Sequence, residues 1–168
     1  KHLRQELWRI RKTLSAQQNG AGAYLLADEF TIAFNRGSDY WLDVAHLERQ
    51  NTDLDSLTAG LSVYQGELLP GFYEDWILLE RERIQSIFNT KMGQLLDRLV
   101  TSERWVAVQE QGERWLALGN TPEAAFRALM LAHGALGDMV QVSTIYQRCI
   151  SELNEKFGIE PSAETRAL

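Results

Sequence analysis

The chain has 168 residues, of which 45% are hydrophobic, and a formal net charge of −6 at pH 7. This length and composition are sufficient for a buried core in one domain, with or without a small appendage. No run of about 18 apolar residues and no signal-peptide layout occurs, so we expect a cytoplasmic protein without a membrane span. A single cysteine excludes an internal disulfide, and three scattered histidines give no metal-ligand spacing, so neither a metal nor another cofactor is expected.

The first fourteen residues are basic although the chain is acidic, with five Lys or Arg residues against one Glu. Apolar residues at i, i+4, i+7 and i+11 define one helical face: Leu3, Leu7, Ile10 and Leu14. The spacing predicts a helix over residues 3–14 whose cations face outward. An ordinary amphipathic surface helix explains this pattern, and so does a helix that binds a polyanion, because phosphate contacts need clustered Lys and Arg.

The next two segments predict a loop and a hairpin. Residues 15–23 are rich in Gly and Gln and lack periodicity, which indicates a loop. Residues 23–34 place β-favouring side chains on both sides of Asp28 and Glu29. A short hairpin with these two carboxylates at its tip is therefore predicted, and the rest of the pattern is helical.

Turn and capping residues divide the helical part. Thr52 and Asp55 have the spacing of a capping box at the start of one helix. Gly119 and Gly137 predict later helix ends, and a short terminal helix is expected after Pro161.

Residues 65–76 predict a structured loop, because two glycines and a proline interrupt the helical pattern. Four apolar side chains are expected to pack from this segment onto the following helix: Leu68, Leu69, Phe72 and Trp76. That helix is predicted over roughly residues 75–101, with Ile77, Ile84, Ile87, Phe88, Leu95, Leu96 and Leu99 as its apolar positions. The charges of residues 80–83 are expected to face solvent in i, i+4 pairs, and Trp76, Trp105 and Trp115 to be buried.

An internal repeat is indicated in the second half, where residues 89–122 align with residues 123–156 at a shift of 34, the tetratricopeptide period. Apolar residues pair with apolar residues: Leu95 with Leu129, Trp105 with Met139, Val108 with Val142, Trp115 with Cys149 and Leu116 with Ile150. Each repeat should be a helix, a tight turn and a helix, stacked on a neighbour that covers its apolar side. The predicted fold is mainly α, with tetratricopeptide-like helical hairpins preceded by a helix and a short β-hairpin.

The sequence leaves two other classes of function to consider, an enzyme and a peptide-binding scaffold. Cys149 and His133 are the nucleophile and base worth considering together, but no oxyanion-hole or acidic orienting motif accompanies them, so we expect no enzyme. A free-standing tetratricopeptide-like peptide-binding scaffold is the alternative function. A carboxylate clamp in such a scaffold is disfavoured, because only Arg127 is basic among the inward positions: Gly93, Asp97, Val100, Arg127, Leu131 and Gly134.

Two segments carry a family resemblance: "YQGELLPGFYEDWILLERERI", residues 64–84, and "LNEKFGIEPSAETRAL", residues 153–168. They resemble the bacterial transcriptional activator domain of the Streptomyces antibiotic regulatory protein (SARP) family and related regulators. The matching residues are Tyr64, Gly66, Leu68, Leu69, Pro70, Gly71, Asp75, Trp76, Gly158, Glu160, Pro161 and Thr165. In that family the domain follows a winged-helix DNA-binding domain. Residues 1–38 are similar to its recognition helix and wing, and residues 39–168 to the activator domain.

The resemblance implies that the chain is a fragment of a bacterial transcriptional regulator. Its helical domain would mediate protein–protein interaction or oligomerisation and orient the adjacent winged helix. The residues expected to contact DNA in the intact protein are Arg4, Gln5, Trp8, Arg11 and Lys12. The expected partners are promoter DNA through the intact winged helix, and the transcription machinery or another copy of the chain, as a homodimer, through the helical domain.

Overall fold

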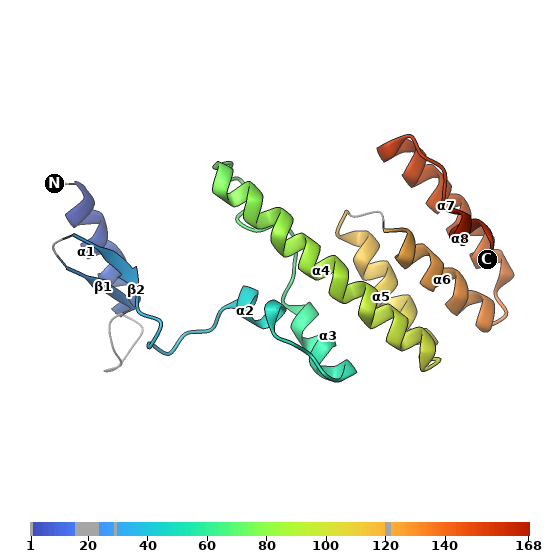
Figure 1. Cartoon of the computed structure of the whole chain (residues 1–168), viewed down its shortest axis with the longest axis horizontal. Helices are drawn as coiled ribbons and strands as arrows, with labels where there is room; N and C mark the ends of the chain where they lie inside the picture. The colour runs from blue at the N-terminus through green and yellow to red at the C-terminus, as the bar shows by residue number, and fades with distance from the viewer. Residues whose placement is uncertain (1, 16–23, 29, 120–121) are drawn as a thin grey trace. The chain divides into compact units, whose positions relative to one another are not determined.

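A computed structural model describes residues 2–28 except 16–23, together with residues 30–119 and 122–168. The chain divides into two compact units, Lys1–Leu42 and Asp43–Leu168, which are described separately. The described residues form eight helices and a two-stranded sheet (Figure 1). The predicted mainly helical class is confirmed.

The first unit contains one helix and one hairpin. Its helix is α1 (His2–Ser15), and its strands are β1 (Leu25–Ala27) and β2 (Ile32–Phe34). The strands pair antiparallel, with Leu26 opposite Ala33, which confirms the predicted hairpin. Most of the loop predicted over residues 15–23 lies outside the described residues.

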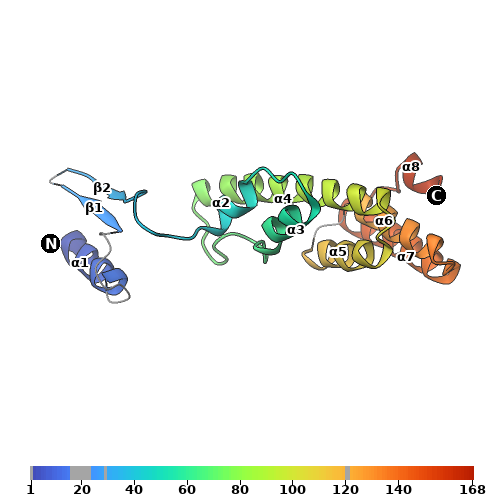
Figure 2. The ribbon, with the colours of Figure 1, turned by 90° about the horizontal axis from the view of Figure 1, so that it is seen from below.

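The second unit is built on one long helix. The bounds of its helices are α2 (Asp43–Glu48), α3 (Leu54–Ser62), α4 (Asp75–Thr101), α5 (Trp105–Ala117), α6 (Glu123–Ala135), α7 (Met139–Phe157) and α8 (Ala163–Arg166). The helix predicted over residues 75–101 and the short helix after Pro161 are both confirmed. Figures 1 and 2 show α2 and α3 beside α4, which is followed by α5, α6 and α7.

One apolar core extends through α2 to α7. All the apolar positions predicted for α4 are buried, except that Ile87 is partly buried. Trp115 is 3% exposed and Trp105 packs partly buried against the core, as predicted. The prediction for Trp76 is wrong, because this side chain is 60% exposed in the first turn of α4.

The turn between α4 and α5 repeats the hydrogen bonds of the turn between α6 and α7 at the shift of 34. In the first turn the backbone N–H groups of Ser102, Glu103 and Arg104 donate to the carbonyl oxygens of Arg98, Val100 and Leu99, respectively. In the second turn those of Leu136, Gly137 and Asp138 donate to the carbonyl oxygens of Ala132, Gly134 and His133. Glu103 and Gly137 both have positive φ, 53° and 80°. Such left-handed residues satisfy the carbonyl groups at a helix end and reverse the chain.

Arg81 on α4 holds the loop that precedes this helix. Its guanidinium donates hydrogen bonds of 2.6–2.8 Å to three carbonyl oxygens, those of Leu68, Leu69 and Phe72. The predicted apolar packing of this loop is correct for Leu68 but wrong for Leu69 and Phe72, which are 42% and 54% exposed. The expectation of solvent-facing charges over residues 80–83 is wrong at Arg81, whose side chain is 12% exposed.

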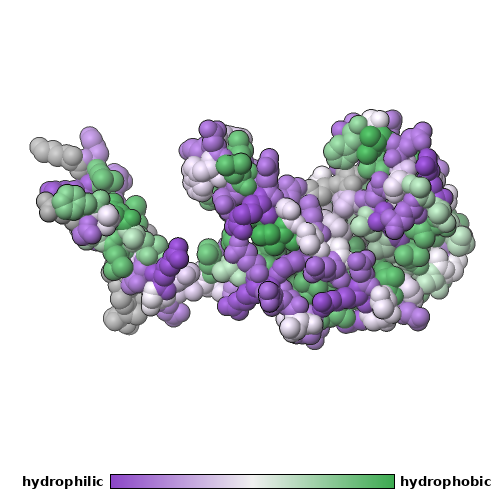
Figure 3. Space-filling model, viewed as in Figure 1, coloured by the Kyte–Doolittle hydropathy of each residue, from purple (hydrophilic) through white to green (hydrophobic). Residues whose placement is uncertain are grey.

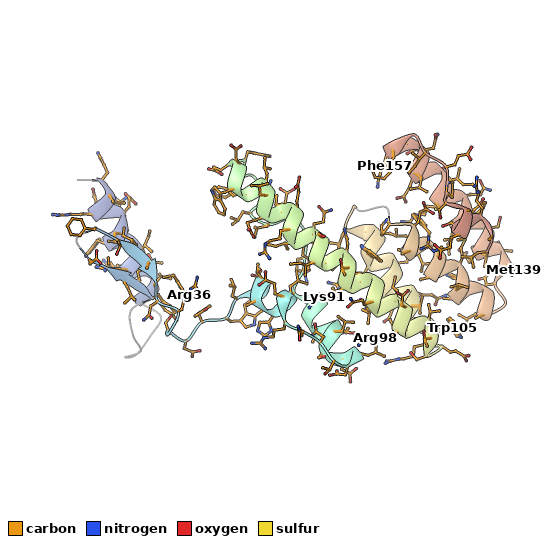
Figure 4. The ribbon with its side chains drawn as sticks, viewed as in Figure 1. Arg36, Lys91, Arg98, Trp105, Met139 and Phe157 are labelled. Atoms are coloured by element: carbon orange, nitrogen blue, oxygen red, sulfur yellow. The ribbon has the colours of Figure 1, made fainter. Side chains whose placement is uncertain are left out.

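Lys91 and Arg114 hold neighbouring parts of the chain in the same way. Lys91 donates from Nζ to the carbonyl of Arg49 and to Oδ1 of Asn51, and Figure 4 shows it with Arg98 on the helix. Arg114 donates to two carbonyls at the C-terminal end of α3, those of Leu61 and Tyr64. Burial lowers the pKa of both cations. A cation at a helix C-terminus also interacts favourably with the helix dipole.

The cap of α3 differs from the predicted capping box. Asp53 occupies the N-cap, and its Oδ1 accepts a hydrogen bond of 2.8 Å from the backbone N–H of Ser56. The helix is therefore capped by Asp53 and Ser56, one position after the predicted pair Thr52 and Asp55. Aspartate fulfils this role as well as Ser or Thr does.

The C-terminal segment folds back onto the start of α6. One carboxylate oxygen, Oε2 of Glu123, accepts hydrogen bonds from Ser162 N, Ser162 Oγ and Thr165 Oγ1. Thr165 is 1% exposed and also accepts a bond of 3.1 Å from Arg127. Burial raises the pKa of Glu123, but these hydrogen bonds and the charge of Arg127 outweigh it, so the pKa is lowered.

We predict that Gly112→Ala destabilises the second unit although alanine is the better helix former. A Cβ at Gly112 would lie 2.9 Å from Cγ of Leu129, which is fully buried and has little freedom to move. Overpacking of this kind costs about 1–3 kcal/mol, which exceeds the helix-propensity gain of about 1 kcal/mol. Thermal unfolding followed by circular dichroism should show a lower midpoint.

Gly93→Ala is the matched control for this prediction. It also lies within a helix, and its new Cβ would meet its nearest neighbour, Cη2 of Trp115, at 4.0 Å. We expect an unchanged or raised midpoint, since the propensity gain is then unopposed. Equal effects of the two substitutions would contradict the close approach of α5 and α6.

We predict that acid weakens the docking of the C-terminal segment. Because folding lowers the pKa of Glu123, its carboxylate stabilises the fold at pH values above the ordinary pKa of 4.5. This stabilisation is lost as the pH falls through the lower pKa of the folded state. Glu123→Gln should therefore lower the free energy of unfolding by about 1 kcal/mol at pH 7 and by less at pH 3. Thermal melts of both proteins between these pH values measure the difference, and a difference independent of pH would contradict it.

Candidate nucleic-acid interface

The five predicted DNA-contacting residues lie on one side of α1. Successive helical residues turn by about 100°, so all five fall within about 120° of arc. These residues are Arg4, Gln5, Trp8, Arg11 and Lys12, and all are exposed. The structure thus places the predicted residues on one accessible face, which we call the cationic face.

Two arginines of the cationic face keep their charge uncompensated. Within the described residues neither Arg4 nor Arg11 makes an ion pair or a hydrogen bond through its side chain. The acidic residue of this helix, Glu6, pairs instead with Arg9 at 2.9 Å. Lys12 Nζ lies 5.0 Å from the ring centroid of Trp8, close enough for a cation–π interaction.

The predicted apolar face of α1 is present but largely exposed in the first unit. Leu3, Ile10 and Leu14 are 70%, 48% and 36% exposed, and Leu7 is partly buried. This face points away from the cationic face. The helix therefore has one side suited to apolar packing and another suited to an anion.

Asp28, one of the two carboxylates predicted at the hairpin tip, accepts hydrogen bonds from the turn itself. Asp28 Oδ1 accepts hydrogen bonds from the backbone N–H groups of Phe30 and Thr31, and Oδ2 accepts one from Thr31 Oγ1. These bonds lower the pKa of Asp28, so the turn keeps its negative charge. Glu29 lies outside the described residues.

Arg36 is a cation of the first unit that the sequence analysis missed. It follows β2 at the end of the hairpin remote from Asp28, in a turn where Asn35 Oδ1 accepts from the N–H of Gly37 at 3.0 Å. Its side chain is exposed (Figure 4). The signal for it is the "NRGS" turn, which places one cation immediately after a strand.

The second unit has a small groove between α4, α6 and α8, with a volume of about 240 Å³. Four of the inward positions considered for a peptide clamp line it: Asp97, Val100, Arg127 and Leu131. Arg127 is already engaged by Glu164 at 3.3 Å and by Thr165. The chain's own C-terminal segment thus uses the one cation that a peptide carboxylate would need.

A larger groove of about 490 Å³ lies between α2, the loop before α4 and α4 itself. Its lining is mostly apolar, with Val44, Leu47 and Ile84 among the residues, and includes the carboxylates of Asp43 and Glu67. Glu67 pairs with Arg81 at 3.0 Å.

Cys149 and His133 do not form a catalytic pair in the described structure. Cys149 is fully buried, and burial raises the pKa of its thiol to about 11. His133 instead contacts Gln109 and lies 3.9 Å from Asp138 Oδ2. Among the described residues no group of three or more His, Cys, Asp or Glu side chains could hold a metal ion, and no helix has the length and apolar character to cross a membrane.

We predict that Cys149 is unreactive in the native protein. A thiol with a raised pKa and no exposed surface offers almost no thiolate to a reagent at pH 8. Reaction with a chromogenic disulfide should be slow in buffer and complete within minutes in concentrated urea. Rapid labelling of the folded chain would contradict the buried position.

Comparison with known proteins identifies the second unit. A search of curated proteins found no match. The family model described as "Bacterial transcriptional activator domain" matches residues 33–168, which include all of α2 to α8. The matched part covers most of the chain and contains the Arg81-held loop and the Glu123-held C-terminal segment. The chain therefore belongs to the bacterial transcriptional activator domain family.

Proposed function

We propose that this chain is part of a bacterial transcription regulator of the SARP type and acts by binding. The cationic face of α1 is the edge of a winged-helix reader that contacts promoter DNA, with β1 and β2 as its wing. The helical unit orients that reader and contacts the transcription machinery or a second copy of the chain, as a homodimer, in the cytoplasm.

The DNA-facing role is supported by the separation of charge along the chain. Arg4 and Arg11 project from one side of α1, unpaired within the described residues, while the chain as a whole is acidic. Because Glu6 neutralises Arg9 instead, Arg4 and Arg11 are available for phosphate groups. This is the observation that carries the proposal.

The tetratricopeptide-like architecture is supported by the repeated turn. Three backbone hydrogen bonds recur at the shift of 34, which is the period of that repeat. Cys149 and Trp115, which align at this shift, are both buried. Stacked hairpins of this kind present extended surfaces for protein partners rather than reactive groups.

The proposed role is binding rather than catalysis, and Cys149 is buried while His133 contacts Gln109. The alternative of a free-standing peptide-binding scaffold would need an open groove with a free cation. Arg127, the basic inward position, is bound by the C-terminal segment. The regulator is therefore the better supported of the two functions.

We predict that changing Arg4 and Arg11 together to Ala in the whole regulator weakens promoter binding at low salt. Loss of two phosphate contacts should also reduce the slope of log affinity against log salt by about 2. Fluorescence anisotropy with labelled promoter DNA across a salt series measures both effects.

Arg9→Ala is the matched control, since Arg9 lies on the same helix and pairs with Glu6. We expect it to change the affinity much less than the double substitution does. An unchanged affinity and salt slope for the Arg4 and Arg11 variant would overturn the DNA-facing role of α1.

A further inference from the structure

Five large apolar side chains are exposed around the start of α4. Leu69, Phe72, Tyr73, Trp76 and Leu79 are 42%, 54%, 75%, 60% and 68% exposed, and we call them the α4 tip patch. Trp76 and Leu79 are three positions apart on the helix and share one face. Figure 3 shows hydrophobic surface at this end of α4. Aromatic residues of this kind are enriched at the energetic centres of protein interfaces.

The backbone under the α4 tip patch is held in a fixed shape. Arg81 binds the carbonyl oxygens of Leu68, Leu69 and Phe72, so one guanidinium closes the loop from the inside. Leu69 has a φ of 48°, a left-handed conformation that is strained for a residue with a side chain. The loop keeps this strained conformation although the rings of Phe72, Tyr73 and Trp76 remain exposed to solvent.

The charge that is left without an ion pair around the α4 tip patch is negative. Of the four carboxylates in residues 65–80, Glu67 pairs with Arg81 at 3.0 Å and Glu80 with Arg83 at 2.8 Å, which leaves Glu74 and Asp75. The Arg81 guanidinium also lies 5.9 Å from the ring centroid of Tyr73. Glu74 and Asp75 lie between Tyr73 and Trp76 in sequence and are exposed. The nearest following cation, Arg81, is turned toward the loop carbonyls, with 12% of its side chain exposed. An apolar centre with an acidic rim is complementary to an apolar surface with a basic rim.

We propose that the α4 tip patch is the surface through which the helical unit binds the transcription machinery. The partner is a protein surface with an apolar groove rimmed by Lys or Arg, which receives the rings of Phe72 and Trp76. This inference rests on the proposed function and names the contact surface for it. The acidic rim disfavours a dimer in which the patches of two copies face each other, because like charges would then meet.

The test measures binding of the fluorescently labelled 168-residue chain to purified bacterial RNA polymerase holoenzyme by anisotropy. Phe72→Ala together with Trp76→Ala should weaken binding at least tenfold, as expected for central interface aromatics. Glu74→Gln together with Asp75→Asn should weaken it less and flatten its salt dependence. Val106→Ala together with Val140→Ala is the control, since these residues are 66% and 75% exposed elsewhere on the unit. Circular dichroism melts of each variant verify that the fold is retained.

Each outcome decides the inference. Weaker binding by the patch variants but not by the control supports it. Equal binding by the patch variant and the wild type overturns the patch and leaves an activator contact elsewhere on the unit. No binding by the wild type overturns both the patch and the polymerase contact of the proposed function. A dimer in sedimentation analysis that Trp76→Ala dissolves would assign the surface to a second copy instead.

Discussion

The second unit depends on basic side chains that end on backbone carbonyl groups. Arg81 and Lys91 project from α4 and Arg114 from α5, and they bind carbonyl groups of the segments before and after α3 and before α4. Two of these carbonyl oxygens, those of Leu61 and Leu69, also accept a backbone hydrogen bond, so the cation adds a second, charge-assisted bond there. The positions of α2, α3 and the loop before α4 therefore follow from three side chains as much as from apolar packing.

Helix positions could be predicted from sequence because they follow from periodicity. The apolar spacing of α4 fixed its bounds, and the shift of 34 located two turns with the same hydrogen bonds. Trp76 and Ile77 are adjacent apolar residues in the first turn of α4, and only Ile77 lies on the side that packs against the protein. Nothing in the spacing distinguishes such a residue from a buried one.

The cations that hold the loops have a signal in the sequence, because they interrupt apolar stripes. Arg81 lies four residues after Ile77 and three before Ile84, and both of these are buried. Lys91 lies three residues after Phe88, on the same stripe. A charged residue inside an apolar stripe predicts that a partner meets it in the folded protein. Which groups form that partner cannot be predicted, because they are carbonyl groups distant in sequence that only the tertiary fold brings close. The cationic face of α1 was predictable residue by residue, because local helix geometry alone determines it.

The equivalent turns at Glu103 and Gly137 show that one backbone shape forms both with glycine and with a residue that is strained in it. Glycine adopts the left-handed conformation freely, whereas glutamate is strained there, yet both chain reversals keep the same bonds. The stacking of the helices on either side must therefore impose the bend. A search for hairpins keyed to glycine would find the second reversal and overlook the first, so divergent copies of such repeats are better sought through their hydrogen-bond register.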